Sequence, residues 1–124
     1  MTNEAMRTVS FIQTKISDDL IISFALCIAD DPTVVESLTL IRTPKYEVFL
    51  EGRERGVTVS FELKEKGLLK EVAFERDAAA VHLRTSESSF GVDLRSISAV
   101  DVTEMLKVLK LMNFDGRLKI TGLE

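Results

Sequence analysis

The chain has 124 residues, which is typical of one domain and long enough to bury a core without disulfides or metals. Hydrophobic residues make up 45% and charged residues 29%, and with only two prolines and six glycines we expect neither disorder nor a long linker. The formal net charge is −4 and no cluster of Lys and Arg offsets it, so we expect no nucleic-acid partner. An acidic balance suits a basic protein partner, although mild negative charge is also common among soluble proteins.

Features that mark the compartment point to the cytoplasm. Cys27 is the only cysteine, which excludes an internal disulfide and argues weakly against a secreted setting. The segment Met1–Arg7 lacks the cationic start and apolar stretch of a signal peptide. No run approaches the roughly twenty apolar residues of a membrane span. We therefore expect a cytoplasmic protein with no membrane partner.

The first strands are predicted from alternation. Val9 and Phe11 alternate with polar residues, Ser17–Asp19 breaks the pattern, and Leu20–Ile28 follows as a strand. Both sides of Leu20–Ile28 are small or apolar, which predicts a central strand buried on both faces.

Asp30-Asp31-Pro32 predicts a turn before the next strand, Leu38–Arg42. A metal site at the two carboxylates is the alternative, but no further ligands follow at the spacing of a cation loop. Two solvated turn carboxylates are the better interpretation.

In the middle of the chain, Tyr46, Val48 and Leu50 alternate with Glu47 and Phe49, which predicts another strand. Gly52–Gly56 predicts a polar hairpin loop. Its two glycines are not a phosphate-binding loop, because no Lys-Ser or Lys-Thr follows and the next element has strand periodicity.

Val57–Lys64 alternates apolar and polar residues without error, and Lys66-Gly67 predicts the turn that ends it. Further strands are predicted from the same period of two. They are Leu69–Glu75, Ala80–Arg84, Phe90–Leu94 and the short Leu118–Thr121.

A single amphipathic helix is predicted from about Ala99 to Asn113, where the period changes from two to about three and a half. Two start signals overlap, Ser98 with Asp101 and Asp101 with Glu104, and the second is the better capping box. Asn113 or Gly116 can supply a left-handed residue that ends the helix. Met105 and Met112 favour core packing over an adaptable binding groove.

Together these elements predict one α+β domain over residues 1–124. It consists of a mostly antiparallel sheet of about seven to nine strands, with the C-terminal amphipathic helix packed on it.

Catalytic chemistry has few candidates in this sequence. His82 is the only histidine, so a histidine-based metal site cannot form within one chain, and we expect it to be exposed and structural. Cys27 lies in the most apolar strand and is interpreted as a small core residue without reactivity. We predict a protein that is not an enzyme, with no catalytic, metal-binding or cofactor-binding residues and no cofactor.

Carboxylates on polar strand faces and turns are the remaining charged feature: Glu62, Glu65, Glu71 and Glu75. Solvation explains them, while the sharper alternative is a strand face of mixed charge that docks a partner.

One stretch resembles a known family. Its segments are Leu38–Arg42, Tyr46–Gly52, Gly67–Val72, the Glu75–Asp77 hairpin, Phe90–Leu94 and the C-terminal helix. Their order is similar to that of the immunity protein ten family of bacterial polymorphic-toxin systems, over roughly residues 20 to 112. The resemblance implies a non-enzymatic protein that binds and neutralises a cognate toxin in the producing cell.

Two functions from different classes follow. The first is a binding protein of the immunity type, with a toxin protein as partner. The second is a small-molecule-binding or sensor domain that holds an apolar ligand between helix and sheet, lined by residues such as Phe24, Phe61 and Phe74. A homodimer that forms through a sheet edge or the helix is a further option.

Overall fold

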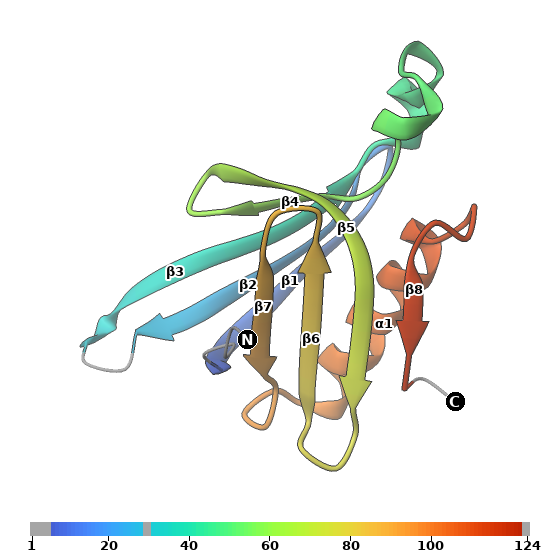
Figure 1. Ribbon diagram of the computed structural model, residues 1–124. Helices are drawn as coiled ribbons and strands as arrows, with labels where there is room; N and C mark the ends of the chain where they lie inside the picture. Colours follow the sequence, from blue (N-terminus) through green and yellow to red (C-terminus); the bar gives the residue numbers. More distant parts are fainter. Residues whose placement is uncertain (1–5, 29–30, 123–124) are drawn as a thin grey trace.

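The computed structural model describes residues 6–28 and 31–122 (Figure 1). Eight strands, two short 3-10 helices and one α-helix are present in this part of the chain. They are β1 Met6–Ile16, β2 Leu20–Ile28, β3 Asp31–Arg42, η1 Pro44–Phe49, η2 Gly52–Glu54, β4 Thr58–Phe61, β5 Lys64–Glu75, β6 Ala80–Thr85, β7 Ser89–Asp93, α1 Ala99–Met112 and β8 Lys119–Thr121. The predicted α+β class with one C-terminal helix is confirmed.

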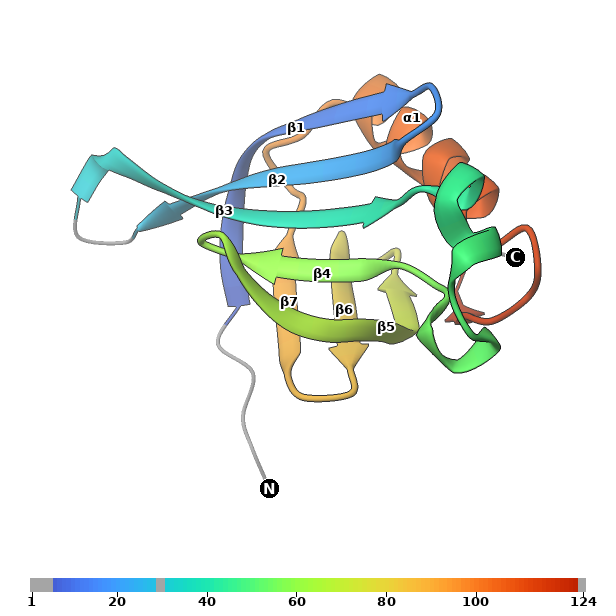
Figure 2. The same cartoon turned by 90° about the horizontal axis from the view of Figure 1, so that it is seen from above.

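The strands follow the order β4-β3-β2-β1-β7-β6-β5-β8, and β4 also pairs with β5. The sheet therefore closes on itself through β4 and β5, with β8 added at the side of β5. All pairs are antiparallel except β1 with β7 and β5 with β8. Two long strands make the closure possible, because β1 and β5 each pair at one end with one half of the sheet and at the other end with the second half. Figure 2 shows β2, β3 and β4 side by side, running across the direction of β6 and β7.

Strand β2 lies between β3 and β1, as its predicted central place requires, but only one of its two faces is fully buried. Leu20, Ile22, Phe24 and Leu26 on one face are buried in the core. On the other face only Ala25 is buried, while Ile21, Ser23 and Cys27 are half-buried. The outer face is apolar in sequence, yet no second layer covers it within residues 6–28 and 31–122, so the expectation of two buried faces was wrong.

The β4–β5 hairpin turns earlier than Lys66-Gly67. Strand β4 ends at Phe61, and Glu62 and Leu63 form the turn with φ of 51° and 67°. Gly67 instead lies within β5 with φ of 91°, where an added Cβ would overlap the Ser86 hydroxyl. The glycine therefore permits a close approach between β5 and the β6–β7 turn.

Helix α1 lies beside β1 and β2 and buries four residues. These are Met105, Val108, Leu109 and Met112, so the predicted core role of both methionines is confirmed. Ser98 is the N-cap, and its side chain accepts a hydrogen bond from the Asp101 amide. The first of the two start signals is therefore the one used, and the expected preference for Asp101 as cap was wrong. Asn113 caps the C-terminus with φ of −96°, and Gly116 takes the left-handed conformation three residues later.

Buried apolar side chains from strands and helix meet in one cluster between α1 and the two halves of the sheet. The space left open to water inside it is about 10 Å³, lined only by apolar residues that include Phe24 and Phe74. Phe61 lies elsewhere, with its ring 5.7 Å from that of Phe90 and the Arg7 guanidinium 4.6 Å above it. A volume of about 10 Å³ holds at most one water molecule.

Within residues 6–28 and 31–122, no helix has the length and apolar character needed to cross a membrane.

Candidate interaction surface

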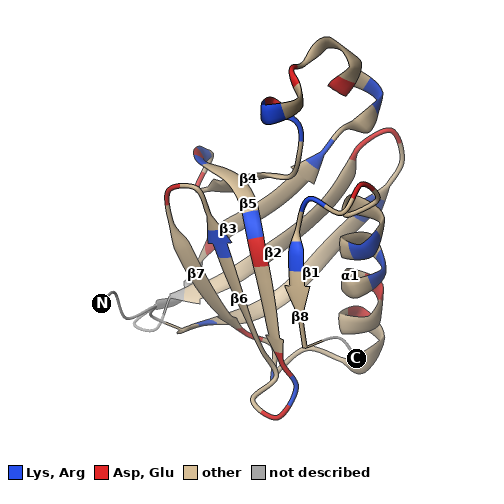
Figure 3. Cartoon of the chain, turned by 45° about the vertical axis from the view of Figure 1, so that its right-hand side comes forward, with Lys and Arg blue, Asp and Glu red and all other residues tan. Residues whose placement is uncertain are grey.

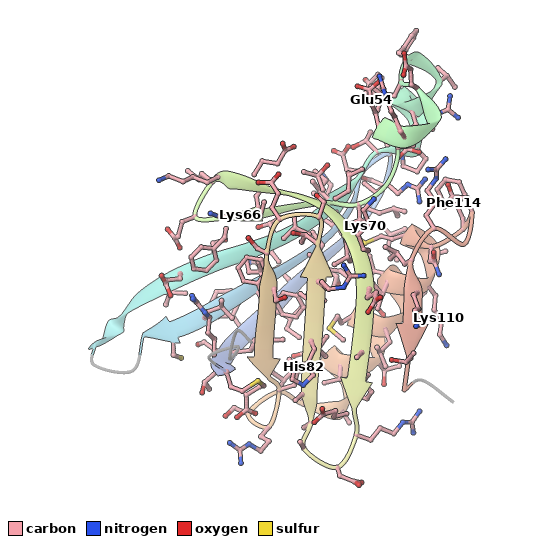
Figure 4. The ribbon with its side chains drawn as sticks, in the orientation of Figure 1. Glu54, Lys66, Lys70, His82, Lys110 and Phe114 are labelled. Atoms are coloured by element: carbon pink, nitrogen blue, oxygen red, sulfur yellow. The ribbon has the colours of Figure 1, made fainter. Side chains whose placement is uncertain are left out.

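The predicted single-residue candidates, Cys27 and His82, lie on different strands, β2 and β6. Figure 4 shows His82 on β6, far from the η1–η2 segment that carries Glu54. The imidazole is half-buried rather than exposed, with 31% of its side chain accessible, and its Nε2 lies 3.2 Å from a Glu75 carboxylate oxygen. Cys27 is a free, half-buried thiol on β2. No three His, Cys, Asp or Glu side chains gather to form a metal site within the described part of the chain.

The four predicted carboxylates fall into two separate places. Glu71 and Glu75 lie on β5, where Glu71 pairs with Arg84 at 2.7 Å. Glu62 lies in the β4–β5 turn and accepts a 2.5 Å hydrogen bond from the Ser37 amide, and Glu65 lies just beyond that turn. Glu65, Glu71 and Glu75 thus share strand β5, and a docking face of mixed charge stays a prediction.

A buried arginine organises a feature that the sequence did not suggest. Arg42 ends β3, and its side chain is fully buried. It donates to Glu47 from Nε and Nη2, both at 2.8 Å, and to Asp115 from Nη1 and Nη2 at 2.9 and 2.7 Å. A further bond of 2.8 Å joins Nη1 to the carbonyl of Met112. Guanidinium has five N–H donors, so every one is used, and none remains for a ligand.

This network perturbs the ionisation of all three side chains. The hydrogen bond from Arg42 is the main reason that the pKa of Asp115 lies well below its usual range, and Arg117 adds to it. The same guanidinium lowers the pKa of Glu47. For Arg42, burial opposes the charge, but the hydrogen bonds to Asp115 and Glu47 outweigh burial and raise its pKa. All three groups are therefore charged at neutral pH.

The η1–η2 segment between β3 and β4, here called the lobe (residues 44–55), rests on this network. Glu47 belongs to η1, and its two hydrogen bonds with Arg42 fix the lobe to β3. Because Arg42 also donates to the carbonyl of Met112, the lobe is linked to the end of α1 as well. Arg117 adds a second tie, since it donates to Asp115 at 2.6 Å and to the Gly52 carbonyl at 2.7 Å. In Figure 1 the lobe protrudes from the body of the protein.

Strand structure was predicted for Tyr46–Leu50, and that expectation was wrong. Pro44 begins η1, and bonds from Tyr46 to Thr43 and from Leu50 to Glu47 close the tight i to i+3 turns of a 3-10 helix. Because Arg42 draws Glu47 inward, the charged residue is buried and its apolar neighbours face outward. Pro44 was the one local signal for a helical turn here. The rest of the arrangement depends on Asp115, a partner of Arg42 that lies 73 residues away in the chain.

Apolar side chains are exposed on the lobe to an unusual degree. Phe49 is 81% exposed and Val48 70%, and Tyr46 and Leu50 are also exposed. Phe114, whose ring lies 4.2 Å from the Arg42 guanidinium, is exposed on the same network. Scattered single apolar residues are normal on a surface, whereas several consecutive ones on a protruding segment are typical of an interaction site.

Charged residues of both signs are spread over the described part of the protein. Figure 3 shows both signs mixed over the lobe, α1 and the strands. Of the 20 acidic residues, Glu4, Asp30 and Glu124 lie outside the described residues, and the side chain of Asp31 is not described. The other acidic residues equal the 16 Lys and Arg in number, so the acidic excess belongs to those four positions. Of the predicted turn Asp30-Asp31-Pro32, Asp30 lies outside the described residues, whereas Asp31 and Pro32 belong to β3, so this strand begins earlier than the predicted Leu38.

Comparison with known protein families, with curated proteins and with solved structures gives no match to this chain.

Proposed function

We propose that this chain is a non-enzymatic protein-binding domain whose contact surface is the lobe, and that it neutralises a cognate toxin by direct contact. The toxin is the partner implied by the resemblance to the immunity protein ten family. The observation that carries the binding role is the exposure of Val48 and Phe49 on a segment fixed by the Arg42–Glu47 bond.

Pre-organisation is what makes such a lobe suited to binding. A flexible loop loses conformational entropy when it binds, and this loss weakens affinity. Here Arg42 already holds the side-chain carboxylate of Glu47, and Arg117 holds the backbone carbonyl of Gly52. Aromatic anchors on a rigid support are typical of the residues that dominate binding energy at protein interfaces. Phe49 and Tyr46 have this character.

The alternative function, binding of an apolar small molecule between helix and sheet, receives less support than protein binding. The enclosed space beneath α1 is about 10 Å³, and its lining offers no polar group to orient a ligand. A ligand between helix and sheet would require that space to expand.

Co-expression tests the toxin role. The product of the neighbouring upstream gene is expressed alone and together with this chain, and growth is measured. Rescue of growth by the intact chain supports the proposal. A neighbour that is not toxic, or toxicity unchanged by this chain, contradicts it.

A further inference from the structure

The outer face of strands β1–β4 is the side of this half of the sheet that turns away from α1. Helix residues Met105 and Leu109 share the buried cluster and its small cavity with Ile22, Phe24 and Leu40, which lie on the inner face of β2 and β3. The residues that alternate with these in the strands therefore point outward. An apolar sheet face is normally covered by a second layer, and none covers this one within residues 6–28 and 31–122.

Strand register arranges the side chains of the outer face in rows. Gln13, Ser23, Thr39, Ser60 and Glu65 lie side by side across five strands, β1 to β5. The hydroxyls of Ser23 and Thr39 lie 3.4 Å apart and share a hydrogen bond. Burial of this pair therefore costs less free energy than burial of two hydroxyls without partners.

The rows on either side are mainly apolar. Ile21 pairs with Ile41 in one of them, and Cys27 pairs with Val35 toward the other end of β2 and β3. Both isoleucines and the cysteine are half-buried, and Val35 is exposed. Half-exposed apolar side chains with few charges are typical of the central part of a protein interface.

Two charged residues mark opposite edges of the outer face. Lys15 on β1 and Glu65 on β5 lie two strands to either side of β3, and the side chains that the rows place between them are uncharged. Both are exposed, and neither has a partner within the described part of the chain. The neighbouring carboxylates are already engaged, since Asp18 pairs with Lys45 and Glu62 accepts a hydrogen bond from a backbone amide of β3.

The size of the outer face suits a weak complex. Neighbouring strands lie about 4.8 Å apart, so the distance from β1 to β5 is about 19 Å. The stretch of β3 from Val35 to Ile41 adds a length of about 20 Å at the usual rise per residue. An area of this size is at the lower end for specific protein complexes, so we expect a dissociation constant of about 10–100 μM.

We propose that this chain forms a symmetric dimer in which the outer faces of two copies pack against each other about a twofold axis along β3. This rotation brings Lys15 of each copy opposite Glu65 of the other, because the two residues lie equally far from β3. Packed sheets lie about 10 Å apart with their strands nearly aligned, a gap that a lysine and a glutamate side chain can span together. The partner is therefore a second copy, whose opposite edges carry the complementary charges.

The dimer surface is separate from the lobe, and it stands whether or not the lobe binds a toxin. Sedimentation equilibrium of the full chain tests it from about 1 μM to 1 mM, a range that brackets the expected constant. We expect the mass to rise from that of one copy toward that of two. Lys15→Glu and Glu65→Lys should each weaken the dimer about tenfold, because each turns two symmetric attractions into repulsions. Lys107→Glu, at an exposed position of α1, is the matched control and should leave the dimer unchanged.

Mixing the two variants gives a result that a folding defect cannot imitate. In a dimer of one Lys15→Glu copy with one Glu65→Lys copy, both contacts between opposite edges are attractive again. The equimolar mixture should therefore dimerise about as strongly as the natural chain. The proposal is overturned if the natural chain remains monomeric up to about 1 mM, if its dimer responds to neither variant, or if the mixture associates no more strongly than each variant alone.

Discussion

Arg42 and Asp115 lie 73 residues apart in the chain and share two hydrogen bonds of 2.9 and 2.7 Å. With Glu47 on its other side, the arginine joins the end of β3, the lobe and the segment after α1. A fully buried charge is stable only while it is paired, so these contacts form one unit whose parts depend on each other.

Replacement of Arg42 is expected to be strongly destabilising. Arg42→Met removes the cation and leaves Glu47 and Asp115 as neighbouring carboxylates without their main partner. We expect a loss of about 3–5 kcal/mol in the free energy of unfolding, measured by urea denaturation. Arg117→Gln, which removes a more exposed contact to the same Asp115, should cost about 1 kcal/mol or less. Similar losses for the two variants would show that the buried arginine has no special role.

Stability should decrease in acid because of Asp115. Its pKa is lowered in the folded state, chiefly by the Arg42 hydrogen bond, so the folded protein binds fewer protons than the unfolded chain. The resulting stabilisation is complete above the unfolded pKa of about 4 and is lost as pH falls from there toward the folded value. Glu47, whose pKa is also lowered, acts in the same direction.

Urea denaturation at a series of pH values from 7 to 2 measures this dependence. Asp115→Asn cannot titrate at that position, so its stability should fall less steeply in acid than that of the natural chain. Identical slopes for the two proteins would exclude Asp115 as the source.

Leu63 is a position where substitution should increase stability. It is 98% exposed with φ of 67°, so its side chain gains nothing from packing while its backbone takes the left-handed conformation. Leu63→Gly should stabilise the protein by about 1 kcal/mol, because glycine has no Cβ penalty there. Leu63→Ala keeps the Cβ and serves as control. A gain in thermal midpoint for alanine as large as for glycine would contradict the backbone explanation.

Local patterns account for what could be predicted of the fold. The change of period at Ser98 predicts α1, and the small or apolar residues on both sides of Leu20–Ile28 predict a central strand, since both signals lie within one element. The Glu62–Leu63 turn escaped prediction because it contains neither glycine nor asparagine, the residues that normally mark positive φ. Closure of the sheet through β4 and β5 depends on pairing that no single segment encodes.

The candidate site was missed for a related reason. Alternation at Tyr46–Leu50 predicts a strand, whereas the arrangement found depends on Arg42 and Asp115 meeting across 73 residues. From the sequence alone, an arginine in a strand is expected on the solvent-exposed face of the sheet, so Arg42 gave no sign of being buried. Only the tertiary structure reveals that Glu47 is buried and that Val48 and Phe49 are exposed.

The lobe is tested most directly by a double variant, Val48→Ser with Phe49→Ser, in the growth assay with the neighbouring gene product. Both side chains are exposed, so the free energy of unfolding should remain within about 0.5 kcal/mol of the natural value. Val100→Ser, which removes an equally exposed apolar side chain from α1, is the matched control. We predict that the double variant loses protection while Val100→Ser retains it. Full protection by a folded double variant would contradict the assignment of the lobe as the contact surface.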